Sequence, residues 1–350
     1  MKIQNISLSS KDKITLFDNF ATMLGAGISI LEAVDSMLED SKGNQKKLLE
    51  NLRKDLTQGQ QISSSFARYP GTFDKVTLNI IRASEEAGTL DVTLKDIKKH
   101  IQKEMEFKDK IQSAMIYPSL ILVVFVGIML LILTFVIPKM ASVFSRMKVE
   151  LPLATQIMLN VSNFITTYPI QLIIGVIAFI AGFIYLFRTK KSFILGIFFS
   201  LPMISGLVKQ IDITRFTRSM SLLLSAGIPL TGALELSQEV VSRKDMRQLV
   251  KHIQTAVMSG KDVSDAVRDA KGLVPMIVIK LIEAGEKTGS LDVAMQNISE
   301  NMDYEVQRTL TTLTALLEPI MLIFIGIAVG GMMISIISPI YGLIGQVRNL

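Results

Sequence analysis

The chain has 350 residues, enough for two domains of ordinary size, and 49% of them are hydrophobic. Its 37 Lys+Arg and 31 Asp+Glu give a net charge of +6 that is spread along the chain, so neither half has the basic surface of a nucleic-acid-binding protein. The sequence has no cysteine, which excludes a disulfide framework, a thiolate nucleophile and a cysteine-based metal site.

The first predicted helix follows a short polar segment, and Ser10 is its candidate N-cap. Gly25 and Gly27 predict a tight turn after this helix, because glycine adopts backbone conformations that end helices. A second helix is expected from about Ser29. The first helix is amphipathic, since its apolar residues recur at helical spacing: Leu16, Phe20, Met23 and Leu24.

A third helix is expected near 45–56, ending at Gly59. The helix after Gly88 has the clearest sequence signals. Thr89 is its candidate N-cap, and Asp91 places a negative charge in its first turn. We expect it to run towards Pro118, where proline predicts a kink or a new helix start. It carries one apolar stripe, formed by Leu90, Leu94, Ile97, Ile101 and Met105.

Three apolar stretches are long enough to cross a bilayer, which takes about 20 helical residues. We expect transmembrane helices at 118–138, 170–187 and 318–339. The polar N-terminus lacks the features of a signal peptide, so we expect it in the cytoplasm. The segments outside the spans should then alternate between the two sides of the membrane. Residues 1–117 and 188–317 are expected in the cytoplasm, and residues 139–169 and 340–350 on the opposite side.

The predicted spans have no ionisable residue in their cores, whereas transporters and pumps generally do. Glu318 lies at the edge of the last span and is expected at the membrane interface, with pairing to another subunit as an alternative. Gly326 and Gly330 form a GxxxG spacing, which lets membrane helices approach closely. Chance spacing in a glycine-containing span is the other interpretation.

The sequence repeats itself. Residues 23–33 (MLGAGISILEA) match 223–233 (LLSAGIPLTGA), and residues 81–91 (IRASEEAGTLD) match 282–292 (IEAGEKTGSLD). The offset is 200 residues for the first pair and 201 for the second. The matching anchors are Gly27 with Gly227, Gly59 with Gly260, Gly88 with Gly289, Pro118 with Pro319, and Pro138 with Pro339.

We therefore predict two copies of one unit, each a cytoplasmic bundle of about six short helices followed by a span. In the second copy the tight helix–helix turn is expected at Gly227, and Pro229 after it suits a helix start. The middle span has no counterpart in the repeat and returns the chain to the cytoplasm.

The sequence offers few candidates for a catalytic, metal-binding or phosphate-binding site. His100 and His252 occupy non-equivalent places in the repeat and lack neighbours at metal-ligand spacing. Lys261 does not complete a phosphate-binding loop, because the surrounding residues break that motif. Glu85 with Glu86, and Glu283 with Glu286, form carboxylate clusters that could bind a cation or serve acid–base chemistry. Glu85 and Glu286 are also candidates for a partner or oligomer contact, although solvated carboxylates at helix ends are the plainer interpretation. We therefore expect no catalytic residue, metal or cofactor.

The repeated segments resemble the twin signatures of the type II secretion F family. KIQSAMIYP at 110–118 and ALLEP at 315–319 are similar to its pre-membrane motifs, and the resemblance covers about residues 9–345. It implies an all-α platform protein in the bacterial inner membrane that couples a cytoplasmic hexameric ATPase to the polymerisation of pilins or pseudopilins. It also implies contacts with other inner-membrane assembly proteins, with lipids and with further copies of the chain.

Two other function classes remain open on the sequence. A small transporter or channel subunit would use the spans, although they lack intramembrane charge. A membrane-bound enzyme or sensor would need a constellation of reactive side chains that the motifs do not supply. Whether the chain serves a pilus or a secretion system is also open.

Overall fold

The computed structural model describes residues 6–139, 142, 153–171, 174–175, 178, 182, 202–269 and 272–347. Over these residues every regular element is a helix, as the predicted all-α class requires. The chain divides into two units: the first contains 1–110 and 206–308, and the second contains 111–205 and 309–350.

The first repeat builds one half of the first unit. Its opening helix is capped by Ser9 rather than by the predicted Ser10. The Ser9 hydroxyl accepts a hydrogen bond from the Asp12 backbone N–H, and the Asp12 carboxylate accepts one from the Ser9 N–H, which completes a capping box. The helices in chain order are α1 (Ser10–Gly25), α2 (Ile30–Asp40), α3 (Gly43–Thr57), α4 (Ile62–Phe66), α5 (Lys75–Ala87) and α6 (Leu90–Leu131).

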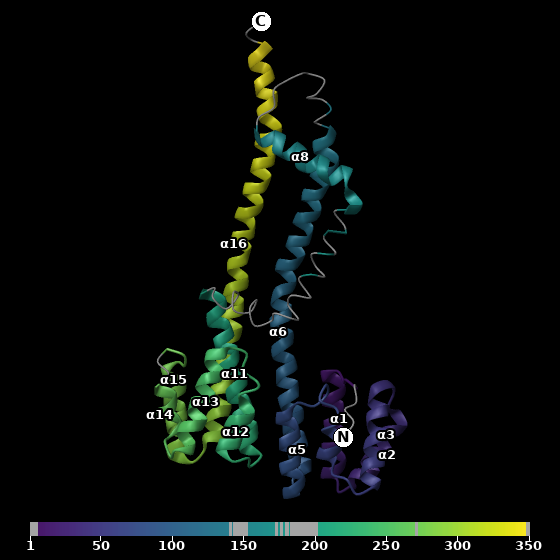
Figure 1. Ribbon diagram of the computed structural model, residues 1–350, viewed down its shortest axis with the longest axis vertical. Helices are drawn as coiled ribbons and strands as arrows, with labels where there is room; N and C mark the ends of the chain where they lie inside the picture. The colour runs from purple at the N-terminus through teal and green to yellow at the C-terminus, as the bar shows by residue number, and fades with distance from the viewer. Residues whose placement is uncertain are drawn as a thin grey trace. The chain divides into compact units, whose positions relative to one another are not determined.

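The second repeat supplies the same succession of helices, and both sets can be followed in Figure 1. Helices α13, α14, α15 and α16 each begin 201 residues after α3, α4, α5 and α6, whereas α12 begins 200 residues after α2. The predicted duplication is therefore confirmed, and its one-residue slip lies between the start of α12 and the start of α13. The helices are α11 (Pro202–Ser225), α12 (Leu230–Ser237), α13 (Lys244–Met258), α14 (Val263–Arg268), α15 (Met276–Thr288) and α16 (Leu291–Val347).

Glycine turns recur at the predicted places. Gly88 and Gly289 end α5 and α15 in the left-handed conformation, with φ of 71° and 68°. A side chain is strained there, so glycine fits best. Gly59 and Gly260, which follow α3 and α13, also have positive φ.

The turn predicted at Gly227 lies between α11 and α12. Gly227 is exposed, has a φ of 78° and donates its N–H to the Leu224 carbonyl at 2.9 Å, and its counterpart Gly27 has a φ of 81°. The expectation that Pro229 starts the next helix was one residue early, because Pro229 is the N-cap of α12 and Leu230 is its first helical residue.

The prediction that Gly25 belongs to the turn was wrong, since it is the last residue of α1. Its counterpart in the second repeat is Ser225, which likewise ends α11. Only the second glycine of the first-repeat turn, Gly27, therefore takes the backbone conformation that favours glycine.

The predicted stripe on α6 faces the core, and α16 has a buried stripe at the matching positions. Leu94 and Ile97 of α6 are fully buried, as are Met295 and Ile298 of α16, while Met105 is half-buried. The first repeat adds an aromatic cluster of Phe17, Phe66 and Phe73, with the last two rings stacked at 4.2 Å. The second repeat has Thr217, Val267 and Val274 at the matching positions, so no aromatic cluster forms there.

The second unit contains the apolar parts of α6 and α16. The helical segments Leu90–Lys139 and Leu291–Gly331 are long and apolar enough to cross a membrane, and their most apolar stretches are almost wholly uncovered by protein. Helix α6 runs through Pro118, and α16 through Pro319 and Pro339, so these prolines do not start new helices. Most of the predicted middle span, 170–187, lies outside the described residues.

Two shorter elements complete the second unit. The π-helical turn η1 (Ile132–Val136) follows α6, and α8 (Leu153–Thr167) packs against it. A π-turn carries one extra residue relative to an α-helix, which locally shifts the backbone hydrogen-bond pattern.

Candidate functional site

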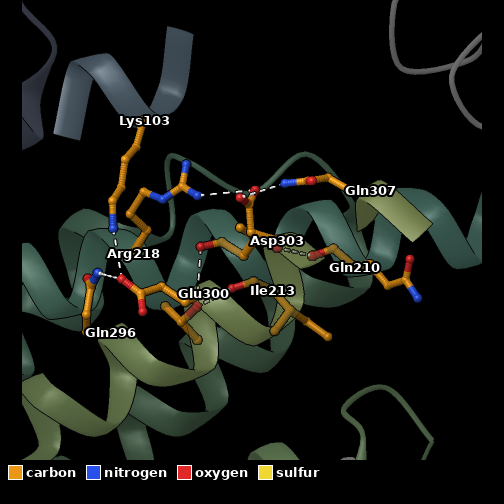
Figure 2. A network of polar contacts seen from close by, with 10 residues as sticks. Lys103, Gln210, Ile213, Arg218, Gln296, Glu300, Asp303 and Gln307 are labelled. Carbon is orange, nitrogen blue, oxygen red and sulfur yellow. Dashed lines mark hydrogen bonds and ion pairs between the residues drawn. The ribbon is translucent and has the colours of Figure 1, made fainter. Parts of the chain in front are cut away.

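Two ion pairs join the repeats within the first unit. The Lys103 ammonium on α6 donates to the Glu300 carboxylate on α16 at 2.9 Å, as Figure 2 shows. Lys75 on α5 donates to Glu239, just after α12, at 2.5 Å. All four side chains are largely exposed, and exposed ion pairs contribute only about 0–1 kcal/mol each. These pairs therefore orient the repeats more than they stabilise them.

A buried arginine forms a third connection between the repeats. Arg218 on α11 lies over the ring of Phe107 on α6, with 5.7 Å from the guanidinium carbon to the ring centre. Its Nη2 is 3.5 Å from an Asp303 carboxylate oxygen, and Gln307 also donates to that carboxylate (Figure 2). A cation over an aromatic ring contributes about 0.5–2 kcal/mol, and burial places this one at the upper end. Arg218 thus links the core of one repeat to the other.

We call the contacts of Lys103, Arg218 and Glu300 the junction between the repeats. Its surroundings shift the pKa of two side chains. The hydrogen bond from Lys103, followed by that from Gln296, holds the pKa of Glu300 below its usual value. Burial lowers the pKa of His100, although Glu104 opposes the shift, so the neutral imidazole is favoured. His100, Lys103, Arg218 and Gln296 line a cavity of about 330 Å³ between the repeats. His100 is therefore part of the junction between the repeats.

The twin glutamates of the signature segments have equivalent internal roles. Glu85, near the end of α5, accepts hydrogen bonds from the backbone N–H groups of Ile62 (2.7 Å) and Ser63 (3.2 Å) at the start of α4. In the second repeat, Glu286 accepts from the N–H groups at the start of α14. The first N–H groups of a helix have no partner inside it, so each carboxylate caps a short helix 22–23 residues earlier.

We expect Glu85→Gln and Glu286→Gln each to lower the free energy of unfolding by about 1–2 kcal/mol. The amide keeps the shape of the side chain but has one acceptor oxygen and no charge, so one N–H at the start of the short helix loses its partner. Thermal unfolding of the purified chain measures the effect. The matched control is Glu86→Gln, which changes the exposed neighbour of Glu85. Equal stabilities for Glu85→Gln and Glu86→Gln would contradict this role.

The other predicted contact residues belong to the second unit. Glu318 is exposed on α16. A Cβ added at Gly326 or Gly330 would meet nothing within 4 Å, so the described part of the chain does not use their GxxxG spacing. Their role as contacts to another chain stays a prediction. Among the described residues, no three His, Asp or Glu side chains are grouped closely enough to hold a metal ion.

Sequence reasoning did not identify the junction residues. Lys103, Arg218 and Glu300 belong to no motif and match no spacing rule. One signal was available: Glu300 occupies the position in the second repeat that Lys99 occupies in the first. Opposite charges at equivalent positions indicate that the two copies have diverged into complementary rather than identical surfaces.

Comparison with known proteins gives the family. The family described as "Type II secretion system (T2SS), protein F" matches the chain twice, over residues 16–138 and 216–339. The chain is 26% identical to the type IV pilus assembly protein PilC of Myxococcus xanthus over 344 residues, which is 97% of this chain and 82% of that protein. It is 28% identical to PilC of Thermus thermophilus over 339 residues, covering 96% and 83% of the two chains.

A relative from a secretion system is similar to the same extent. The chain is 25% identical to the type II secretion system protein F of Aeromonas hydrophila over 345 residues, which is 97% of this chain and 88% of that protein. The two matched segments coincide with the two structural repeats and together cover more than half of the chain. The chain therefore belongs to the type II secretion system protein F family.

Proposed function

We propose that this protein is a non-enzymatic platform in the bacterial inner membrane for assembling a type IV pilus or a type II secretion machine. The observation that carries the proposal is the twofold family match on a duplicated architecture, in which each helical bundle ends in a helix that continues as an apolar segment. Relatives named for pilus assembly and for type II secretion support both settings.

The proposed topology has three spans, at 118–138, 170–187 and 318–339, with the N-terminus in the cytoplasm. The two bundles of about six helices each, in 1–117 and 188–317, would then lie on the side where ATP is available. The exposed apolar stretches of α6 and α16 support two of these spans, because such surface is stable in lipid rather than in water.

In this proposal, the bundles receive force from a cytoplasmic hexameric ATPase. Each bundle shares one continuous helix with a span, so a rotation of the bundle displaces the apolar segment that would contact pilins or pseudopilins. The junction of Lys103, Glu300 and Arg218 passes motion from one repeat to the other, since these contacts bridge α6, α11 and α16. Further copies of the chain, lipids and other inner-membrane assembly proteins complete the proposed machine.

Deletion of the gene tests the function directly. We expect a deletion strain to lose its surface filaments or its secreted proteins, and expression of the chain from a plasmid to restore them. Electron microscopy of the cells and analysis of the culture medium give the two readouts. A deletion strain with normal filaments and normal secretion would refute the platform role.

The junction gives a sharper test of the mechanism. In the complemented strain, Lys103→Glu should reduce assembly, because a like-charge pair with Glu300 replaces an attractive one. A change of about 1 kcal/mol shifts the docked population of the repeats about fivefold while leaving each bundle folded. The double variant Lys103→Glu/Glu300→Lys should restore assembly. Lys95→Glu, on an exposed position of the same helix, is the control; an equal effect of Lys95→Glu would argue against a role for the junction.

A further inference from the structure

Helix α8 contacts the rest of the second unit through a specific hydrogen bond. The Ser162 side chain is fully buried, and its hydroxyl donates to the backbone carbonyl of Leu133 at 2.5 Å. Leu133 lies within the π-turn η1 at the end of the first apolar segment. The contact therefore fixes one face of α8 against the end of that segment.

The backbone explains why the Leu133 carbonyl needs a donor from outside its own helix. In an α-helix this carbonyl would accept from the N–H of Ile137, but in η1 that N–H is donated to Ile132. The next residue is Pro138, which has no N–H. An unsatisfied carbonyl in an apolar environment costs several kcal/mol, so Ser162 supplies the missing hydrogen bond.

The surface of α8 divides into three stripes with the same 4-3-4 spacing, each turned by about 100° from the next. One stripe is polar and exposed, and consists of Gln156, Asn160, Asn163 and Thr167. The stripe beside it is apolar and also exposed, and consists of Ile157, Val161 and Phe164, with Tyr168 directly after the last residue of the helix. The third packs towards η1 and contains Met158, Ser162 and Ile165.

We infer that α8 lies in the membrane interface, with its stripe of Ile157, Val161, Phe164 and Tyr168 inserted among lipid acyl chains. This inference rests on the proposed membrane location of the protein. The three stripes then match three environments: protein on the Ser162 side, acyl chains on the apolar side and water on the polar side.

Two observations favour lipid as the occupant of the apolar stripe. Ile170 and Ile174, after the end of α8, are also exposed, and η1 exposes Phe135, so exposed apolar residues occur on several parts of this unit. Phe164 and Tyr168 have ring centres 5.7 Å apart at its end, and tyrosine is enriched where membranes meet water. Residues 153–168 carry no charge, so insertion should depend on apolar area and not on salt.

Fluorescence quenching tests the inference, because the natural chain has no tryptophan. The full-length variants Phe164→Trp and Asn163→Trp are each reconstituted into phosphatidylcholine vesicles with or without brominated acyl chains. We expect brominated lipid to cause a large loss of emission at position 164 and little at position 163. The loss at 164 should be the same in low and high salt. Leu122→Trp, on an exposed position of the first apolar segment, should be quenched strongly.

The outcomes distinguish an error in the placement of α8 from an error in the proposed membrane location of the protein. If Leu122→Trp is quenched but Phe164→Trp is not, the interfacial placement of α8 is wrong while the membrane location stands. If neither is quenched, the membrane location itself fails. Equal quenching at 163 and 164 would refute the division of α8 into a lipid face and a water face. Quenching at 164 that disappears on co-reconstitution with a pilin would show that a protein partner, rather than lipid, occupies the stripe.

Discussion

Replacing Asp55 with alanine should lower the free energy of unfolding by about 3 kcal/mol. Asp55 on α3 is almost fully buried, accepts a hydrogen bond from the Ser65 hydroxyl at 2.6 Å and forms an ion pair with Arg68. Removal of the carboxylate leaves the partly buried guanidinium without its counter-charge, in a site where its Nε already has no partner among the described residues. Chemical denaturation of the purified chain measures the loss.

The second repeat shows that the fold tolerates apolar residues at the positions of Asp55 and Ser65. Ala256 and Ala266 occupy the positions of Asp55 and Ser65, and both are buried. The double variant Asp55→Ala/Arg68→Met should therefore recover much of the loss, because it leaves no uncompensated charge. Asp40→Ala, at an exposed position on α2, should stay within about 0.5 kcal/mol of the natural chain. If Asp55→Ala behaves like Asp40→Ala, the buried pair does not support the fold.

Gly285→Ala should destabilise the second repeat by about 1–3 kcal/mol. A Cβ at this position would lie 2.5 Å from the Ala294 Cβ and 3.3 Å from the Leu291 Cα, so α15 and α16 would have to move apart. The first repeat accepts a larger residue, since Ser84 takes the equivalent position and donates to the Ile81 carbonyl. Thermal unfolding of the purified variant gives the measurement.

Two companion variants show whether the close approach causes the effect. Gly232→Ala lies inside α12, where the nearest atom is 3.5 Å away, so the gain in helix propensity should leave stability unchanged or raised by up to about 1 kcal/mol. Gly285→Ala/Ala294→Gly should regain most of the lost stability, because the second change removes the atom that the new methyl group meets. A double variant no more stable than Gly285→Ala would refute this explanation.

Local rules predicted much of the fold. The turns at Gly88 and Gly227 were predictable because only a few residue types adopt a left-handed backbone, and the stripe of α6 because its spacing repeats along one helix. The choice of Ser9 over Ser10 as N-cap was also encoded locally, since only Ser9 has an acidic residue three positions later. Pro118 was harder to interpret, because a long helix tolerates the loss of one backbone hydrogen bond when its neighbours keep theirs.

The candidate site depended on contacts that no local rule reaches. Glu85 reaches the start of α4 only because α5 folds back beside α4. The two bonded residues, Ile62 and Glu85, are 23 positions apart in the chain. The pairing of Lys103 with Glu300 joins residues 197 positions apart, and it depends on how the two repeats dock. The sequence alone offered the charges and their places on the helices, but not the partner of each.

The stretch from the start of α12 to the start of α13 is one residue longer than its counterpart from α2 to α3, so the length of this connection can change. From α3 onward, the helix starts of the two repeats keep one register, so the longer connection has left the packing on either side intact. The buried Asp212 carboxylate accepts hydrogen bonds from the Ser242 and Arg243 N–H groups, each at 2.8 Å, which anchors the longer version. The shorter turn after Ser41 is therefore a suitable place to insert an epitope or a fluorophore-labelling tag without disturbing the helices that it connects.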